Sequence, residues 1–367
     1  MAVTRPRFAR QQNAEFFNTL RTRVNDYFES NKISKFGERK MAIKTVFMIA
    51  LFLTPYFLVV TNVVESTWAI LAMWTIMGIG TSGIGLSVMH DANHGVLSKN
   101  KTINKMMEST MNFVGGNASM WQTKHNVLHH TFTNIEGHDD DIDAPGILRF
   151  SPHQPLKKMH KFQHIYAWVF YGFLTLMWIT YSDFKSVFHF KKEGLIRDKK
   201  TFWKEFRQVA IWKLIYWSYL LVLPLIFSSA AIWVTLLGFF IMHFVTGFTL
   251  SVIFQLAHVM PECDFPIPDE TTGEIDNNWA VHQLSTTTNF APKNRILSWF
   301  IGGLNYQVEH HLFTNISHVH YPEVAKIVKK TAKEFGLPYY SEDKFFKALA
   351  NHGRMLKKLG TPPAFAA

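Results

Sequence analysis

Seven of the 18 histidines in this chain stand in short groups whose spacing suits metal binding, and an eighth candidate, His258, stands alone. His90 and His94 are four residues apart, as are His125 and His129, so on a helix each pair shares one face. Two adjacent histidines on a helix are instead rotated by about 100° from each other, so their rings can serve two different metal ions. The eight candidates are His90, His94, His125, His129, His130, His258, His310 and His311.

The composition restricts the kind of metal site that these histidines can form. The single cysteine, Cys263, excludes an internal disulfide, a four-cysteine cluster and a cysteine-rich zinc site. Eight histidines are too many for one catalytic zinc, and the Glu-x-x-His and His-Glu-x-x-His motifs of soluble metal enzymes are absent. Neutral imidazole suits iron, so the set predicts a pair of iron ions. Any one of the pairs alone is more often a surface accident, so the prediction depends on helices that bring the groups together.

Four apolar runs are long enough to cross the ~30 Å hydrocarbon layer of a membrane. They cover residues 46–64, 68–89, 211–227 and 232–256, and short loops separate the members of each pair, which predicts two transmembrane hairpins. The second run ends directly before His90, and the fourth ends close to His258. The pair His90 and His94 and the single His258 therefore lie where a crossing leaves the bilayer.

A fifth apolar run, 165–181, is ambiguous, and the distribution of basic residues decides how it is interpreted. If it crossed the membrane, His94 and His258 would lie on opposite sides and the lysine-rich stretch 185–207 would be exported. If it lies in the interface, all 38 Lys and Arg residues except Lys213, at a helix start, fall on one side. The positive-inside rule therefore predicts four crossings, with 165–181 as an interfacial helix or a re-entrant hairpin.

These features predict an all-α integral membrane protein with four transmembrane helices in two hairpins, further interfacial helices and a helical cytoplasmic cap. The cap comprises residues 90–210 and 258–367, holds the histidine-rich di-iron site and ends in two lysine-rich amphipathic helices within 326–359. Residues 1–44 are expected to form a cytoplasmic amphipathic arm near the membrane surface, and residues 45–367 a single membrane domain. Both termini are expected in the cytoplasm.

The net charge of +11 raises the question of nucleic-acid binding. The basic residues form no compact patch interleaved with aromatic residues, which is the pattern that nucleic-acid binding would require. A membrane with anionic lipids accounts for the charge better. We therefore expect no nucleic-acid partner.

Three sequence groups carry a resemblance to a known family. His-Asp-Ala-Asn-His (90–94), His-Asn-Val-Leu-His-His (125–130) and Gln-Val-Glu-His-His (307–311), in this order and separated by paired apolar runs, resemble the histidine boxes of membrane fatty acid desaturases. The glutamine that opens the third group, Gln307, resembles the front-end branch, which inserts a double bond between an existing one and the carboxyl end of an acyl chain. Related sphingolipid desaturases share this glutamine. The similarity covers most of residues 41–355.

The resemblance implies roles for the matching residues. The histidines of the three boxes would be iron ligands, and His258 would be the additional ligand that follows the last crossing. Gln307 would stand where other branches have a histidine and would bind iron weakly or through water. One departure concerns an asparagine that contributes through water in the more distant acyl-CoA desaturases: here its position holds Phe254, so Gln255 or solvent would have to substitute.

The resemblance also implies the cofactors and partners. They are two iron ions, O2 as co-substrate, and a fatty acyl substrate carried on CoA or on a lipid of the bilayer. Breaking an unactivated methylene C–H bond is beyond acid–base chemistry, so O2 and two electrons are required. The chain lacks the His-Pro-Gly-Gly motif of a fused cytochrome, so we expect a separate ferredoxin, cytochrome or reductase as electron donor. This absence also favours the bacterial plasma membrane over the endoplasmic reticulum.

Other polar residues have more ordinary interpretations. Asp91, Asp139, Asp141 and Glu309 are candidate hydrogen-bond partners for the ligand rings, although for the acidic run 138–143 we favour a solvated loop. His243, in the fourth apolar run, is about 22 Å along a helix from His258 and is either a packing residue or part of an acyl tunnel. The remaining histidines are expected at surface or interface positions: His138, His153, His160, His164, His189, His282, His318, His320 and His352.

Two alternatives stay open at this point. A lipid hydroxylase or a sphingolipid desaturase would use the same histidine boxes, because these reactions diverge only after the first hydrogen is removed. A histidine-lined metal transporter would place its histidines inside the crossings, whereas here only His243 lies well inside one.

Overall fold

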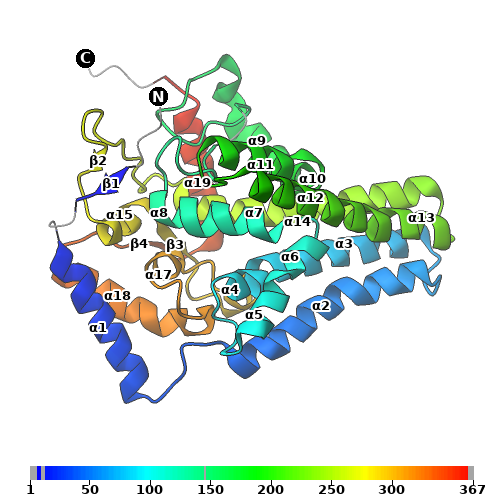
Figure 1. The fold of residues 1–367 in the computed structure, drawn as a ribbon, viewed down its shortest axis with the longest axis horizontal. Helices are drawn as coiled ribbons and strands as arrows, with labels where there is room; N and C mark the ends of the chain where they lie inside the picture. Colours follow the sequence, from blue (N-terminus) through cyan, green and yellow to red (C-terminus); the bar gives the residue numbers. More distant parts are fainter. Residues whose placement is uncertain (1–5, 10–12, 144–145, 363–367) are drawn as a thin grey trace. The chain divides into compact units, whose positions relative to one another are not determined.

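The computed structural model describes residues 6–9, 13–143 and 146–362 of the chain. Helices make up nearly all of its regular structure (Figure 1), as predicted. Two short parallel sheets complete it: β1 (Arg7–Phe8) pairs with β2 (Glu274–Ile275), and β3 (Thr288–Phe290) pairs with β4 (Tyr340–Glu342). The chain divides into two compact units. The first comprises the described parts of residues 1–36, 123–168 and 253–367, and the second comprises residues 37–122 and 169–252.

The described residues include four helices that are long and apolar enough to cross a membrane, as predicted. The first is α2 (Glu38–Val60), and the second runs through α3 (Thr67–Gly83), η1 (Ile84–Met89) and α4 (His90–Asn93). The third runs through α12 (Lys199–Trp217), η5 (Ser218–Val222) and α13 (Leu223–Phe227), and the fourth is α14 (Ile232–His258).

Two of the candidate crossing helices begin more than two turns before the predicted apolar runs. The helix α2 begins at Glu38, so residues 38–44 belong to the first candidate crossing and not to the N-terminal arm. The third helix begins at Lys199, twelve residues before the predicted start, because the side chain of Asp198 caps it by accepting the backbone N–H of Thr201. Lys213 therefore lies in the middle of this helix and not at its start.

Small residues of α3 allow close helix packing within the second unit. A Cβ atom on Gly80 would lie 2.8 Å from the backbone nitrogen of Phe52 in α2, and one on Gly78 would lie 2.7 Å from the backbone oxygen of Met242 in α14. Thr246 of α14 also donates its hydroxyl to the oxygen of Gly78 at 3.0 Å. The helix α3 is thus packed backbone-to-backbone against both of these neighbours.

The two short loops between the paired crossings lie side by side. The amide of Asn62 donates to the oxygen of Phe227 at 2.9 Å and accepts the backbone N–H of Ser229 at 2.5 Å. Asn62 has a φ of 59°, which asparagine tolerates better than most residues. Both loops therefore lie at the same end of the second unit.

The ambiguous fifth run forms a bent pair of helical segments, Lys158–Tyr171 and Leu174–Lys192, with 68° between them. The bend packs on α14, where a Cβ on Gly247 would lie 2.7 Å from the oxygen of Gly172. The segments comprise η3 (Lys158–Phe162), α9 (Gln163–Tyr171), α10 (Leu174–Met177), η4 (Trp178–Ser182) and α11 (Asp183–Lys192).

A buried ion pair joins the bent segment to the third crossing. Lys213 of α12 pairs with Asp183 at the start of α11, and its ammonium also donates to the oxygen of Gly115 at 2.6 Å. Both side chains are buried. The cation is thus held by two oxygens that come from distant parts of the chain.

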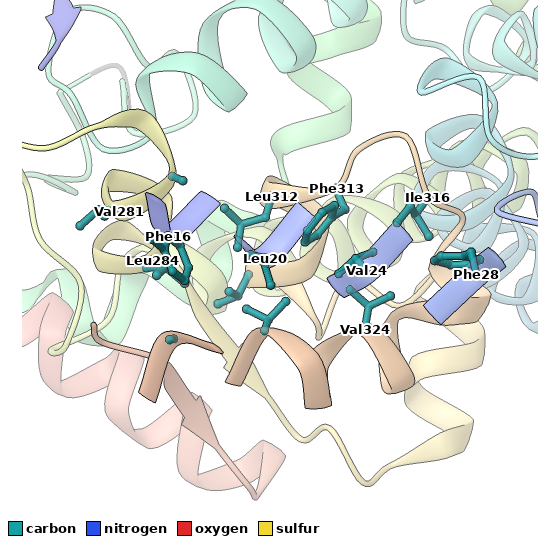
Figure 2. Packing of buried hydrophobic residues seen from close by; sticks show 14 residues of the cluster. Phe16, Leu20, Val24, Phe28, Val281, Leu284, Leu312, Phe313, Ile316 and Val324 are labelled. Atoms are coloured by element: carbon teal, nitrogen blue, oxygen red, sulfur yellow. The ribbon is translucent and has the colours of Figure 1, made fainter. Parts of the chain in front are cut away.

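The N-terminal helix α1 (Ala14–Ser30) packs inside the first unit. Figure 2 shows the side chains of Phe16, Leu20, Val24 and Phe28 facing the helices α17 (Gln307–Leu312) and α18 (Tyr321–Glu334). All four side chains are buried. The apolar face of this arm is thus covered by protein, and its location near the membrane surface stays a prediction.

The two amphipathic helices predicted in 326–359 are present as α18 and α19 (Phe345–Leu359), and the irregular stretch after the fourth crossing contains no helix between His258 and Trp279. The expectation of one domain from residue 45 to residue 367 stays a prediction. The remaining helices are α5 (Lys101–Glu108), α6 (Thr110–Phe113), α7 (Ala118–Gln122), η2 (Thr123–His129), α8 (His130–Phe132), α15 (Trp279–Thr286), α16 (Arg295–Phe300) and η6 (His318–His320).

Candidate metal centre

Three elements of the first unit bring six of the eight predicted histidines together. The continuous helix η2–α8 carries His125, His129 and His130, the last residue of α14 is His258, and α17 carries His310 and His311. All six side chains are buried. Burying so many imidazoles is costly unless their nitrogen atoms are satisfied, so a cluster of this size points to a ligand.

The helical geometry of the second histidine group differs from the prediction. We expected His125 and His129 to share a face and His130 to be rotated away, but η2 is a π-helix, in which residues i and i+5 are neighbours. The Nε2 atoms of His125 and His130 are 3.1 Å apart, and their ring centroids are 4.5 Å apart, against 5.6 Å for His125 and His129. The wider turn therefore directs all three rings to one region.

His129, His258 and His311 form one group whose potential ligand atoms all lie within 4.8 Å of one another. Each ring uses Nδ1 to donate to an oxygen. His129 donates to the carboxylate of Asp139 at 3.0 Å. His258 donates to the backbone oxygen of Thr286 at 3.2 Å, and His311 donates to the amide oxygen of Gln283 at 2.7 Å. An oxygen of this kind can only accept, so each Nδ1 carries a proton and Nε2 is the nitrogen left to bind a metal ion. With Nε2 unprotonated, the three rings fit a metal ion.

Gln283 is a functional residue that the sequence prediction missed. Its amide nitrogen donates to the backbone oxygen of His130 at 3.3 Å, which orients the amide oxygen toward His311. The hydroxyl of Thr133 lies 2.9 Å from the same oxygen. Gln283 lies within the stretch that resembles the desaturases, and the available signal was a polar residue in the short, largely apolar run 279–284.

His130, His310 and His311 form a second group with ligand atoms within the same 4.8 Å limit. The Nδ1 of His310 lies 3.3 Å from the hydroxyl of Tyr321, and its ring is stacked 5.5 Å from that of His125. The ring planes of His310 and His311 are 86° apart. The second group contains both His310 and His311, and His311 also belongs to the first group, so the assignment of the two rings to different metal ions stays a prediction.

Asp139 is a buried partner of the site and not part of a solvated loop. It accepts the backbone N–H groups of Asn134 at 2.9 Å and Asp141 at 3.0 Å, in addition to the ring of His129. Burial acts to lower the pKa of His129, but the carboxylates of Asp139 and Asp141 outweigh it and raise that pKa to about 9. His129 in turn lowers the pKa of Asp139. The same carboxylates favour any cation bound at this ring.

Glu309 was predicted as a partner for a ligand ring, and this prediction is wrong. Its carboxylate accepts the amide N–H of Asn289 at 2.8 Å and the hydroxyl of Tyr339 at 3.0 Å. Asn289 also accepts the backbone N–H of Val308 at 3.0 Å. Burial raises the pKa of Glu309 to about 7. The residue thus ties the start of α17 to β3 and to the segment before β4.

Gln307 and Phe254 both lie in the first unit. Gln307 is the first residue of α17 and is buried, and its amide nitrogen makes no hydrogen bond to any described residue. The ring of Phe254 lies 6.5 Å from that of His125. The neighbouring Gln255 donates its amide to the backbone oxygen of Asp141 at 3.3 Å.

His90 and His94 lie in the second unit. Their ring centroids are 4.9 Å apart, and the backbone N–H of His94 donates to the oxygen of His90 at 3.2 Å, so the predicted shared face is present. The ring of His90 packs 5.9 Å from Trp121. Their participation in metal binding stays a prediction.

Several of the histidines without a predicted role are buried and not at the surface. These are His160, His282, His318 and His352. His243 is a hydrogen-bonded packing residue: its Nε2 accepts the hydroxyl of Tyr216 at 2.8 Å, and its Nδ1 donates to Thr175 at 3.1 Å. Both ring nitrogens of His243 thus have a hydrogen-bond partner, which accounts for the burial of the ring.

Comparisons with known proteins agree with the chemistry of the site. Residues 66–343 match the family model described as fatty acid desaturase. An sn-1 linoleoyl-lipid 6-desaturase of Synechocystis sp. is 35% identical over 98% of this chain and 99% of its own length, and one of Arthrospira platensis is 33% identical over 95% and 93%. An acyl-lipid (8-3)-desaturase of Physcomitrium patens is 36% identical over 96% of this chain and 73% of its own length.

Proposed function

Because the chain belongs to the fatty acid desaturase family, we propose that it inserts a double bond into the acyl chain of a membrane lipid. It is accordingly an oxidoreductase. The observation that carries the proposal is the group His129, His258 and His311, three buried rings whose Nδ1 atoms donate to oxygens and whose potential ligand atoms all lie within 4.8 Å of one another.

The proposed metal ligands are the full set from the sequence, bound to two iron ions. They are His90, His94, His125, His129, His130, His258, His310 and His311, with Gln307 as a weak or water-mediated ligand. Bound iron would supply the activation of O2 that removal of hydrogen from an unactivated methylene requires. For His90 and His94, support comes from their motif and from their shared helix face.

The residues around the rings have defined tasks in this proposal. Asp139 and Gln283 hold the protons of His129 and His311 on Nδ1, so that Nε2 is available to a metal. The burial of the rings keeps bulk water away from the reacting carbon atoms. The chain must also hold one chosen C–C bond of the substrate against the site, which selects the product.

The names of the relatives narrow the proposed substrate. Two of them are called sn-1 linoleoyl-lipid 6-desaturases, so we propose a linoleoyl chain esterified in a membrane lipid in preference to an acyl-CoA. Gln307 at the start of the third box supports front-end insertion, between the existing double bonds and the carboxyl end.

The proposed arrangement in the membrane follows the charge distribution. Four crossings form two hairpins, and the histidines and both termini face the cytoplasm of a bacterial cell. Electrons would come from a separate ferredoxin, cytochrome or reductase. The basic residues on the cytoplasmic side would favour an acidic donor.

Expression in a host supplied with linoleate, followed by analysis of its lipids, tests the function. We expect a new double bond on the carboxyl side of the existing ones, in lipid-bound chains. A His311→Ala variant should lose at least about 100-fold in product and should bind less iron. The exposed His153 of the same unit provides the matched control, and its alanine variant should be unchanged. Full activity of the His311→Ala variant would exclude the proposed site.

The products also separate the remaining alternatives. A hydroxylated acyl chain without a new double bond would identify a hydroxylase, and modification confined to sphingolipids would identify a sphingolipid desaturase. Membership of the desaturase family decides against a metal transporter.

A further inference from the structure

Helix α16 (Arg295–Phe300) is a short apolar helix at the surface of the first unit. Four of its residues are apolar, yet none of the six is buried. The side chain of Ile296 is 83% exposed and that of Trp299 is 42% exposed. The backbone of the helix is nevertheless well defined, because Asn294 caps it by accepting the N–H of Leu297 at 3.1 Å.

The start of α19 continues this apolar surface. Strands β3 and β4 are parallel, so the segments that follow them leave the same end of the sheet. The backbone N–H of Ala291 donates to the oxygen of Glu342 at 2.7 Å, and Lys293 pairs with Asp343 at 3.3 Å. Phe346, one residue into α19, is 82% exposed. We call Ile296, Trp299 and Phe346 the apolar tip.

The exposure of Ile296 and Phe346 is exceptional for the first unit. Among its other described residues, the next most exposed large apolar side chain is Ile165, at 63%. Proteins seldom keep such side chains in water unless they mark an interaction site. The two most exposed ones, moreover, are presented from the same end of one sheet.

The charges beside the apolar tip suggest what covers it. The residues beside it in the sequence include Lys293, Arg295, Lys344 and Lys347, against the acidic Glu342 and Asp343, which leaves an excess of two positive charges. Tryptophan together with aliphatic and basic residues is typical of segments that lie in the interface between lipid and water. In a chain with four candidate crossings, an anionic bilayer surface is always within reach.

We propose that the apolar tip of the first unit inserts into the interface of an anionic membrane, as a second lipid contact besides the crossings. Ile296 and Phe346 enter the region between headgroups and acyl chains, and the basic residues contact the headgroups. The contact anchors the sheet β3–β4, and Asn289 of β3 accepts the backbone N–H of Val308 in the helix that carries His310 and His311.

Spin labels on the full-length protein in lipid nanodiscs test this proposal. The single native cysteine is buried, so labels can be placed at Ile296→Cys and Phe346→Cys, with Lys330→Cys on the exposed face of α18 as the matched control. All three positions are exposed, so these substitutions should leave folding unchanged. Accessibility to O2, which partitions into lipid, and to a water-soluble nickel chelate is then measured for each label.

At Ile296 and Phe346 we expect nickel accessibility at least about threefold below that at Lys330, with O2 accessibility retained. Equal nickel accessibility at all three positions would overturn the proposal, and so would loss of accessibility to both reagents, which would indicate a protein partner. In nanodiscs with phosphatidylglycerol the protection should exceed that in phosphatidylcholine alone. Arg295→Gln with Lys344→Gln should remove this difference, and protection that never depends on phosphatidylglycerol would overturn the anionic assignment. Desaturation is not the readout, so the result is independent of the proposed activity.

Discussion

Asp139 determines which nitrogen of His129 carries the proton. Its buried carboxylate is fixed by two backbone N–H groups, so it presents an acceptor to Nδ1 and to no other ring atom. An amide at this position could instead present N–H to Nδ1, which would move the ring proton to Nε2. A protonated Nε2 cannot bind a metal.

We therefore expect Asp139→Asn to lower iron affinity about 10- to 100-fold while leaving the fold intact. Iron content after dialysis against graded chelator, measured together with circular dichroism, checks both parts. Asp140→Asn is the matched control, since Asp140 is the next residue of the same acidic run and pairs with Lys124. Equal iron retention in the two variants would show that Asp139 does not orient the ring.

At this scale the sequence predicted the histidines better than their partners. The spacing of the second and third boxes is local, and it identified five of the six rings that the first unit does bring together, the sixth being His258. The partners are not local: Gln283 and Thr286 are each 28 residues from the ring that they orient. The acidic run 138–143 looked like a solvated loop because its composition carries no sign of burial. Only the packing of Asp139 beneath His129 revealed its role.

At the scale of elements, the pair Lys213–Asp183 fixes the bent segment to the third crossing. Removing one partner of a buried pair leaves an uncompensated charge, which costs about 3–5 kcal/mol, whereas replacing both partners by apolar residues is often neutral. We expect Lys213→Met to destabilise the protein by that amount and the double variant with Asp183→Leu to recover most of it. Unfolding in detergent micelles measures both.

The exposed pair Lys326–Glu323 provides the comparison for this cycle. Lys326→Met should change the free energy of unfolding by less than about 1 kcal/mol, because solvent screens an exposed pair. If Lys213→Met were equally mild, the buried pair would not hold the segment. The sequence placed Lys213 at a helix start, since an apolar run cannot show where a polar first half of the same helix begins.

The packing of the N-terminal helix α1 against the first unit can be tested directly. Leu20 is buried against α18 and its neighbours, so Leu20→Ala should destabilise the first unit by about 2–5 kcal/mol. Arg21→Ala, at the adjacent exposed position, is the control. Thermal unfolding in micelles distinguishes the two locations of the helix: an arm that lay on the bilayer would give the same midpoint for both variants.

Helix α19 contributes a pH-dependent contact through His352. The ring donates from Nδ1 to the backbone oxygen of Val259 at 2.8 Å, and burial lowers its pKa to about 4 from the ordinary 6.5. As the pH falls below 6.5, His352 binds a proton in the unfolded chain, whereas in the folded protein it stays neutral until about pH 4. Stability therefore falls with falling pH across this window, by at most about 3 kcal/mol.

The variant His352→Gln keeps an N–H donor but cannot titrate. At pH 7 the metal-free wild type should have a clearly higher thermal midpoint than the variant. At pH 5 the two midpoints should be similar. Comparing the two proteins cancels the titration of the other histidines, which both share. An advantage of the wild type that does not change with pH would contradict the assignment.

For the whole molecule, the four candidate crossings were predictable because length and hydropathy are properties of the sequence alone. The division into two units was not, since each unit is assembled from segments far apart in the chain. The bent segment 158–192 shows why: its composition suits a crossing, and only the break near Gly172 and the pair Lys213–Asp183 show how it packs.

The arrangement of the whole chain across the membrane rests on where the ends of this bent segment lie. The loops around Asn62 and Ser229 contact each other, so both lie on the same side of the membrane. The proposed topology makes this side the outside. Single cysteines at Val63 and Ser229 are expected to react with an impermeant maleimide added to spheroplasts. Cysteines at Met159 and Lys192, the two ends of the bent segment, should react only after the membrane is opened, as should the control Lys330→Cys.

The outcome for Met159 and Lys192 decides more than the topology. If both are protected, the segment enters and leaves the membrane on one side, and His94 and His258 are separated by two crossings. If one of them is labelled from outside, three crossings separate these histidines, and they lie on opposite faces of the bilayer. The eight histidines then cannot share a pair of iron ions, and His90 and His94 would have to be removed from the proposed ligands.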